Sequence, residues 1–264
     1  NHRLRGREST ADEVFCRKLC DGLGVHLETD RWPGRNGGAS EAAARAARHG
    51  FFATRMKAHR STVLWLAHQQ DDIAETMLMR LARGSGLGGL TAPRPIQTGI
   101  DRRTHLRPLL TLKKSELMAA LRRAGARWRD DPTNETGLYF RNRVRNKVLP
   151  GWAKAAGRDA VAGAARSREL LEEDDEALKS WAQKLAAIHR DRVLDVRALA
   201  AVPRAVTRRI LHQWLLTVVP AADLSRQGFE LLLRAVERGE PTKFSLGRKD
   251  FALIKKGQMS LKRG

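Results

Sequence analysis

An uninterrupted apolar run over Val63–Ala67 changes abruptly to polar residues from position 68 onward. A short run of this kind is typical of a strand that is buried on both faces of a parallel sheet. Apolar residues then recur every four positions between 73 and 81, which predicts a helix from about Asp72 to Arg83. Gly84 is a natural end for that helix. The pattern therefore predicts a strand that leads into a helix across a short polar turn.

Three residues with chemical potential lie in that turn, namely His68, Asp71 and Asp72. They would stand at the carboxyl end of a strand and the amino end of a helix, where open α/β sheets bind ligands. We therefore take them as candidate catalytic residues. A purely structural interpretation stays open, because aspartates also cap the free N–H groups of a helix start and a histidine can be an ordinary edge residue.

The same reasoning predicts further elements along the chain. Apolar spacing predicts helices over about 14–23, from Ser40 onward, over 113–124, from Trp152 to about His189, within 193–219 and over 229–236. A short strand is predicted over Val25–Glu28, an exposed turn over Trp32–Gly38 and a small hairpin from Lys243 onward. We therefore expect an α/β fold, a parallel sheet with flanking helices, followed by a mainly helical domain.

The glycine-rich segment Gly84–Gly89 satisfies the dinucleotide-binding pattern G-x-G-x-x-G. That pattern requires a strand before it and a helix after it, whereas here a predicted helix precedes it and a proline-containing stretch follows. We therefore interpret these glycines as a loop and not as a cofactor site.

Charge points to the kind of partner. The 264 residues contain 50 Lys and Arg against 29 Asp and Glu, which gives a net charge of +21 and a pI near 11.2. Up to Pro150 there are 28 basic and 15 acidic residues, and after it 22 and 14, so the two parts carry +13 and +8. A folded chain with such an excess on both parts is expected to bind a polyanion, with nucleic acid as the default.

Other classes of protein are not favoured by the composition. No apolar run approaches the roughly 18 residues that span a bilayer, so we expect no membrane segment and a cytoplasmic protein. Cys16 and Cys20 stand four apart in a helical pattern without a second Cys/His pair, so we expect reduced cysteines and neither a disulfide framework nor a zinc site.

Two groups of arginines are candidates for phosphate binding. Arg45 and Arg48 lie on neighbouring turns of one predicted helix, and guanidinium groups bind phosphate oxygens in pairs. Arg141, Arg143 and Arg145 form part of a run with four positive charges in seven residues. Each group also has the plain interpretation of a solvated helix face.

Five motifs in this order resemble the bacterial tRNA(Ile)-lysidine synthase family, which are N-type ATP pyrophosphatases with an adenine nucleotide alpha hydrolase-like fold. They are His68–Thr76 (HQQDDIAET), Arg80–Gly86 (RLARGSG), Arg107–Leu110 (RPLL), Asp131–Asn134 (DPTN) and Arg141–Arg145 (RNRVR). The resemblance implies a catalytic domain over residues 1–151, followed by a connecting helix and a helical tRNA-binding domain over 152–264. Taken together the motifs are specific, although none would suffice alone.

The resemblance also implies a reaction and its participants. ATP, with Mg²⁺, would adenylate the C2 oxygen of the wobble cytidine in a tRNA(Ile) with a CAU anticodon, and the side-chain amine of free L-lysine would then displace AMP. Asp71 and Asp72 would orient the amine and accept its proton, and His68 would help to shape the nucleotide site. Whether the protein is a homodimer is left open.

The sequence departs from the family pattern in one important respect. The glycine-rich S-G-G-x-D-S phosphate loop and the first strand, which the family places ahead of Asn1, are absent from this sequence, so we expect tRNA binding without lysidine formation until that segment is supplied. A non-catalytic RNA-binding remnant of the family is therefore an alternative. A tRNA thiolase is a third choice, although Cys16 and Cys20 lack the arrangement that sulfur transfer needs.

Overall fold

The computed structural model describes residues 1–3, 5–32, 41–99, 101–135, 137, 139–185, 187–188, 191–219, 224–247 and 249–264. Among the predicted features, most of the turn over Trp32–Gly38 and the helix start at Ser40 lie outside the described residues. The chain forms two compact units, Asn1–Glu169 and Leu170–Gly264, which divide inside one long helix. Assignment of separate functions to residues 1–151 and 152–264 stays a prediction.

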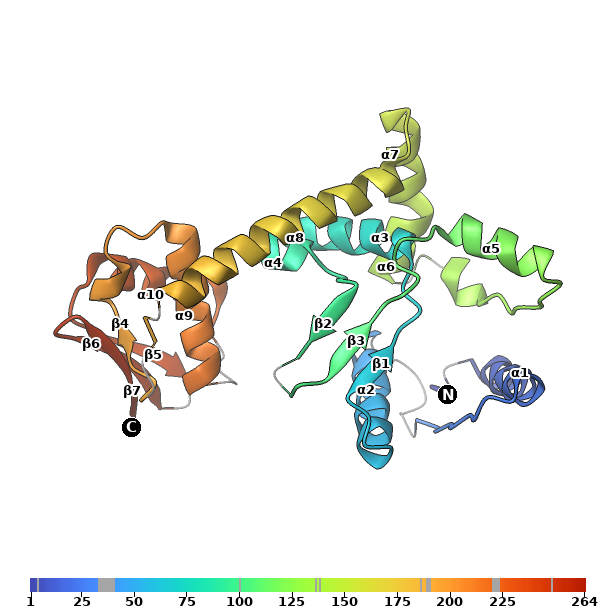
Figure 1. Cartoon of the computed structure of the whole chain (residues 1–264), viewed down its shortest axis with the longest axis horizontal. Helices are drawn as coiled ribbons and strands as arrows, with labels where there is room; N and C mark the ends of the chain where they lie inside the picture. The colour runs from blue at the N-terminus through green and yellow to red at the C-terminus, as the bar shows by residue number, and fades with distance from the viewer. Residues whose placement is uncertain are drawn as a thin grey trace. The chain divides into compact units, whose positions relative to one another are not determined.

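The first unit begins with two helices and then alternates strands with helices (Figure 1). Its elements are α1 (Arg7–Leu23), α2 (Glu41–Ala58), β1 (Val63–Trp65), α3 (Gln70–Leu81), α4 (Leu87–Leu90), β2 (Ile96–Thr98), β3 (Thr104–Leu106) and α5 (Lys114–Arg123). A 3₁₀ turn (Pro132–Glu135), α6 (Phe140–Arg143), a π-helix (Val144–Val148), α7 (Leu149–Ala156) and the start of α8 (Ala160–Lys184) follow. The predicted strand–turn–helix over 63–83 is confirmed.

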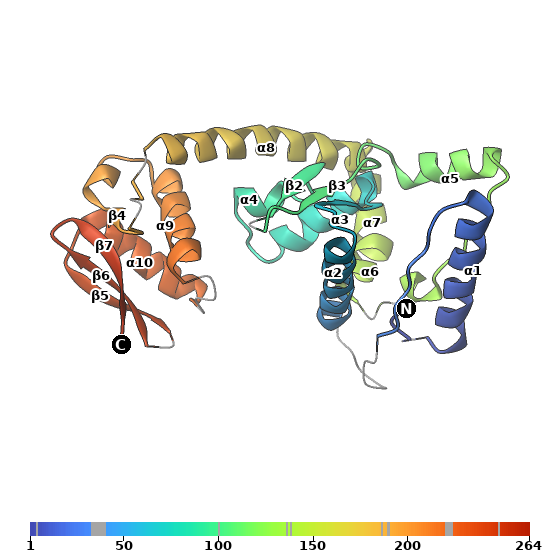
Figure 2. The ribbon, with the colours of Figure 1, turned by 60° about the horizontal axis from the view of Figure 1, so that its bottom comes forward.

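The sheet of the first unit has the order β1-β3-β2, with β1 and β3 parallel and β2 antiparallel. The prediction that the 63–67 run is buried on both faces is wrong, because Val63 and Trp65 are 43% and 70% exposed. β1 is an edge strand among the described residues, and Val63 and Trp65 lie on its uncovered face. Helix α2 contacts β1, and α3 packs against α6 and the π-helix (Figure 2).

Two further predictions need correction. Val25–Glu28 forms no strand, since this segment has no ladder partner in the part of the chain that the structure describes. The single helix predicted from Trp152 to about His189 is interrupted at Gly157, whose φ of 60° ends α7 in the left-handed region. Asp159 then accepts a hydrogen bond from the N–H of Ala162 and starts α8.

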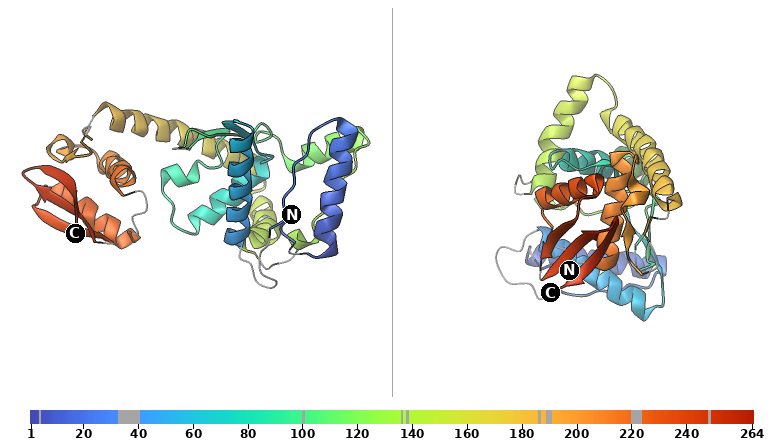
Figure 3. Two further views of the ribbon diagram at one scale, coloured as in Figure 1. Left: turned by 90° about the horizontal axis from the view of Figure 1, so that it is seen from below. Right: turned by 90° about the vertical axis from the view of Figure 1, so that its left-hand side faces the viewer.

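The second unit combines helices with a four-stranded antiparallel sheet (Figure 3). After α8 come β4 (Leu194–Asp195), a 3₁₀ turn (Arg197–Leu199), α9 (Arg204–Val218), α10 (Arg226–Arg238), β5 (Thr242–Gly247), β6 (Asp250–Lys255) and β7 (Gln258–Arg263). The hairpin predicted from Lys243 is thus part of a β5-β6-β7 meander that β4 joins beside β7. Its inner face and the apolar faces of α9 and α10 enclose one core around the fully buried Trp214.

Candidate active site

The turn between β1 and α3 is held in place by the neighbouring strand and its following loop. The N–H of Leu66 donates to the carbonyl of Leu106, and the N–H of Gln70 donates to the carbonyl of Leu112. The turn therefore lies at the carboxyl ends of the parallel strands β1 and β3, as the sequence predicts.

His68 is half-buried in this turn. Burial lowers the pKa of its imidazole to about 4; Asp72 opposes that shift, and the positive charges of Arg107, Arg141 and Arg45 add to it. The ring is therefore neutral near pH 7. Its Nδ1 atom is buried and has no hydrogen-bond partner among the described residues.

Asp71 and Asp72 point to different neighbours. One oxygen of Asp71 accepts a hydrogen bond from the N–H of Lys114 at 2.8 Å, so this carboxylate stabilises the start of α5. Asp72 accepts the N–H of Gln69 at 2.8 Å through Oδ2 and the guanidinium of Arg141 at 2.5 Å through Oδ1. Asp72 thus has a capping role and a side-chain partner at the same time.

Sequence reasoning did not select Glu75, which is only 1% exposed. Its Oε2 lies 2.6 Å from Nε of Arg141, and its Oε1 lies 2.6 Å from Nε of Arg145. Asp72, Glu75, Arg141 and Arg145 together make two carboxylates and two guanidiniums, which we call the carboxylate–arginine cluster. The signal was available, because Glu75 stands three residues after Asp72 and therefore on the same helix face.

The two arginines of this cluster come from the short helical segment after residue 139. Arg141 belongs to α6 and Arg145 to the π-helix that continues it, so both project toward α3. Irregular π-turns of this kind are frequent at functional sites. Hydrogen bonding to Glu75 raises the pKa of Arg145, so its charge is firmly retained.

The remaining predicted phosphate-binding arginines lie outside the cluster. Arg143 donates to the carbonyl of Gly137 and stacks on the ring of Phe140, 5.7 Å from the ring centroid. Arg45 and Arg48 are exposed on α2. Arg48 borders a cavity of about 1160 Å³ that also reaches Trp32 and Tyr139.

Comparison with known proteins shows which family the chain belongs to. A model of the PP-loop domain matches residues 1–152. The chain belongs to the PP-loop family. The PP-loop part of the resemblance found in the sequence is therefore confirmed, together with the adenine nucleotide alpha hydrolase-like fold that it implies.

Full-length relatives give the same result for this PP-loop chain. It is 32% identical over 253 residues to the tRNA(Ile)-lysidine synthase of Bacillus licheniformis, an alignment that covers 93% of the chain and 50% of that protein. Identity to the enzyme of the same name is 38% in Leifsonia xyli, covering 78% and 62%, and 34% in Pseudomonas syringae, covering 91% and 56%. The chain thus spans about half to two thirds of the length of these relatives.

A solved structure supports the fold of this PP-loop chain. The U34-tRNA thiolase NcsA from Methanococcus maripaludis has a TM-score of 0.50 at 17% identity, covering 62% of this chain and 57% of that one. At this identity the likeness concerns the fold alone.

Two findings concern the expected membrane segments and cysteines. Among the described residues, none of the helices is both long enough and apolar enough to cross a membrane. Cys16 and Cys20 both lie on α1 as free thiols, in agreement with the predicted helix.

Proposed function

We propose that this chain acts in attaching L-lysine to C2 of the wobble cytidine in a tRNA(Ile) with a CAU anticodon, with ATP as the activating substrate. The observation that carries the proposal is its 32% to 38% identity to tRNA(Ile)-lysidine synthases. The net charge of +21 supports a polyanionic partner.

The reaction has two balanced steps. The C2 oxygen of cytosine attacks the α-phosphorus of ATP, and pyrophosphate leaves. The ammonium group of lysine gives up one proton and becomes a nucleophile. Its nitrogen then forms a bond to C2, the C2–O bond breaks, AMP leaves with the electron pair of that bond, and the nitrogen gives up a second proton. The site must therefore orient a cationic amine, accept its protons and bind phosphate oxygens.

The carboxylate–arginine cluster suits the first two tasks. Asp72 retains 13% exposure of its side chain, so a ligand amine could reach it, whereas Glu75 is enclosed by Arg141 and Arg145. We assign to Asp72 the contact with the amine and to Glu75 the positioning of both arginines. His68, which is neutral near pH 7, offers a ring nitrogen that can accept a proton or a hydrogen bond.

We assign phosphate binding mainly to Arg45, and to a smaller extent to Arg141 and Arg145. Each guanidinium of the cluster already donates to a carboxylate, so its charge is largely compensated. Arg45 makes no ion pair among the described residues and is available to an anion. Arg48 and Arg143 remain proposed phosphate contacts as well.

Magnesium and a cytoplasmic location are also parts of the proposal, whereas the question of a homodimer is left open. The described residues contain no group of three His, Cys, Asp or Glu side chains placed to hold a metal ion. In the proposal, an Mg²⁺ ion would be held mainly by the phosphates of ATP and would supply charge compensation there.

A comparison of neighbouring aspartates tests the proposal. In a chain extended upstream by the first strand and the glycine-rich phosphate loop, Asp72→Asn should reduce incorporation of labelled lysine into the CAU tRNA by ~100-fold or more, because general acid–base groups typically contribute that much. Asp71→Asn, the matched control, keeps an acceptor for the Lys114 N–H and should stay within about threefold. If the intact protein binds the tRNA but incorporates no lysine, the non-catalytic RNA-binding alternative is correct.

A further inference from the structure

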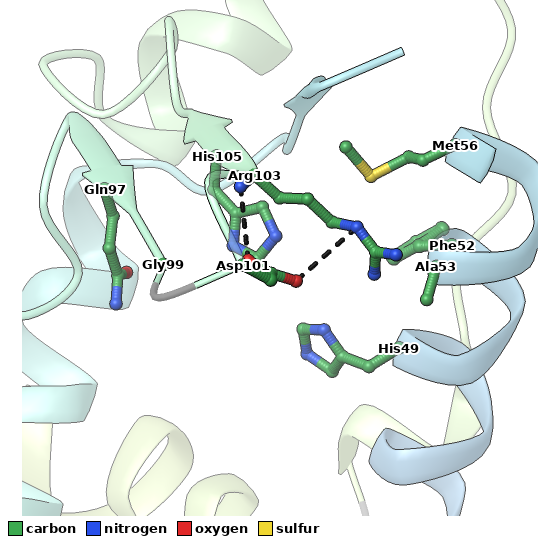
Figure 4. A pocket seen from close by; sticks show the side chains of 9 residues that line it. All are labelled: His49, Phe52, Ala53, Met56, Gln97, Gly99, Asp101, Arg103 and His105. Atoms are coloured by element: carbon green, nitrogen blue, oxygen red, sulfur yellow. Dashed lines mark hydrogen bonds and ion pairs between the residues drawn. The ribbon is translucent and has the colours of Figure 1, made fainter. Parts of the chain in front are cut away.

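A second hollow lies in the first unit, between α2 and the β2–β3 hairpin (Figure 4). It has a volume of about 240 Å³ and none of its lining residues belongs to the carboxylate–arginine cluster. Its walls combine the rings of His49, Phe52 and His105 with the thioether of Met56 and the amide of Gln97. We call it the α2–hairpin pocket.

The residue spacing on α2 and the strand register of the hairpin explain why these side chains line one pocket. On α2, Arg45, His49 and Phe52 follow the spacing i, i+4, i+7 and share one face. On the hairpin, Gln97 is directly opposite His105 in the antiparallel register, so both point to the same side of the sheet. The centroids of the His49 and His105 rings are 6.2 Å apart, which fixes the distance between the two walls.

Two guanidinium groups outside the lining of this pocket, those of Arg45 and Arg107, are near enough to lower the pKa of both His49 and His105. Arg45 is one helical turn before His49, and Arg107 is two residues after His105, on the same side of its strand. Arg107 is 8% exposed and donates to the carbonyl of Arg94 at 2.6 Å and to Oε1 of Gln97 at 3.2 Å. These partners are neutral, and Nε of Arg107 is buried with no hydrogen-bond partner in the described part of the chain.

The pocket also contains one carboxylate, that of Asp101, which pairs with Arg103 at 3.5 Å. Neither Arg45 nor Arg107 forms an ion pair with a carboxylate in the part of the chain that the structure describes. Burial and the nearby arginines lower the pKa of both His49 and His105, so these rings are neutral at pH 7. A buried cation without a counter-ion is unfavourable, so an anion beside these guanidinium groups would stabilise the arrangement.

We propose that the α2–hairpin pocket binds a single nucleotide of single-stranded RNA, with the base against the rings of His49, Phe52 and His105 and the phosphate on Arg45 and Arg107. Aromatic rings stack on unpaired bases, and the amide N–H groups of Gln97, whose oxygen accepts from Arg107, supply donors for a base edge. The volume is below the roughly 300 Å³ at which drug-sized pockets begin, so it suits a ring and little more. The choice of RNA rests on the proposed function; a free nucleotide offers the same chemistry.

The first experiment changes the stacking surface. Binding of a seven-nucleotide RNA with the CAU anticodon-loop sequence is followed by fluorescence anisotropy for the unmodified chain, His49→Ala and His49→Phe. His49→Ala should weaken binding by roughly 5- to 100-fold, the usual range for loss of one base–aromatic stack, and His49→Phe should restore it. His59→Ala is the control, because this histidine pairs with Glu28 outside the pocket and should not alter affinity.

The second experiment changes the phosphate contact. Arg45→Ala should lower the slope of log affinity against log salt by about 0.7, the value for one phosphate of a single strand. Lys57→Ala removes the same charge from the last turn of α2, away from the pocket, and should leave the slope unchanged. Thermal unfolding of each variant shows whether the fold is retained.

The outcomes separate the two proposals. If 5′-CMP binding responds to His49→Ala but RNA binding does not, the ligand of the pocket is a free nucleotide. If RNA binds the unmodified chain and neither His49→Ala nor Arg45→Ala changes its binding, the pocket assignment is overturned while the proposed function stands. If the unmodified chain binds neither RNA nor 5′-CMP, both are overturned.

Discussion

Replacement of Glu75 by glutamine tests whether the carboxylate–arginine cluster is one energetic unit. The glutamate accepts hydrogen bonds from Nε of Arg141 at 2.6 Å and from Nε and Nη2 of Arg145 at 2.6 and 3.0 Å. Glutamine has the same side-chain length as glutamate, but it places an N–H group opposite one of these donors. The guanidinium groups of Arg141 and Arg145 are then left with Asp72 as their one carboxylate in the cluster. Removing one partner of a buried pair costs about 3–5 kcal/mol, a large part of the roughly 5–15 kcal/mol that stabilises a domain.

Urea unfolding measures this loss. With a denaturant slope of about 2–3 kcal/mol per molar, the midpoint of the transition of the first unit should fall by roughly 1–2 M in Glu75→Gln. Glu169→Gln is the matched control, since Glu169 pairs with Arg166 at 3.2 Å on an exposed helix face and should shift the midpoint very little.

A double-mutant cycle decides whether the effect comes from coupling. Glu75→Gln combined with Arg145→Gln removes one charge of each sign and leaves Asp72 paired with Arg141. The double variant should therefore be more stable than the sum of the single losses by about 1–3 kcal/mol. Additivity within ~0.5 kcal/mol would refute the reasoning that these four residues act together.

Three further predictions follow from the structure. The pKa of His68 is lowered to about 4, so below pH 6.5 the unfolded chain binds a proton at this histidine and the folded chain does not. The free energy of unfolding should therefore fall as the pH falls from 6.5 toward 4. His68→Gln should reduce this pH dependence, as measured by urea unfolding at pH 7 and pH 5. Asp71→Ala removes the acceptor of the Lys114 N–H and should cost about 1 kcal/mol without affecting the second unit, as measured by hydrogen exchange of α5. Trp214→Ala should destabilise the second unit by about 3–5 kcal/mol in thermal unfolding, whereas Trp214→Phe, which loses the bond to the carbonyl of Arg192, should cost less.

Local periodicity predicted the elements around the site well, since the strand and helix over 63–83 depend on neighbouring residues alone. It failed where the outcome depends on distant partners. Val25–Glu28 has suitable residues for a strand but no ladder partner among the described residues. Trp65 is exposed because it lies with Val63 and Ala67 on the face of β1 that is uncovered, whereas Leu64 and Leu66 on the other face are half-buried. One failure was local, because Gly157 ends a helix within a pattern that its alanine-rich surroundings favour.

In the candidate site too, the sequence predicted the local features and missed those that depend on distant segments. The turn that carries His68, Asp71 and Asp72 is local, so the sequence predicted its place at the end of a strand. The orientation of the two aspartates depends on α5 and α6, which are distant in the sequence, and their separation could not be predicted. Glu75 was overlooked because a glutamate on a helix is normally solvated, and only the packing of the π-helix against α3 buries it.

A count of charges does not show which arginines are compensated by a carboxylate. The compensation of each arginine explains how the site could bind the proposed amine and phosphate in different places. Arg45 and Arg141 are equivalent in a sum of charges, yet Arg141 is compensated by Asp72 and Glu75, whereas Arg45 has no carboxylate partner among the described residues. A cationic amine requires a carboxylate that can still accept a hydrogen bond, and a phosphate requires an uncompensated guanidinium. Both kinds of environment act on His68, because Asp72 raises its pKa while Arg45 and Arg107 lower it. In the proposed reaction this histidine would therefore stand between the region that attracts lysine and the region that attracts phosphate, where the amine must meet the activated cytidine.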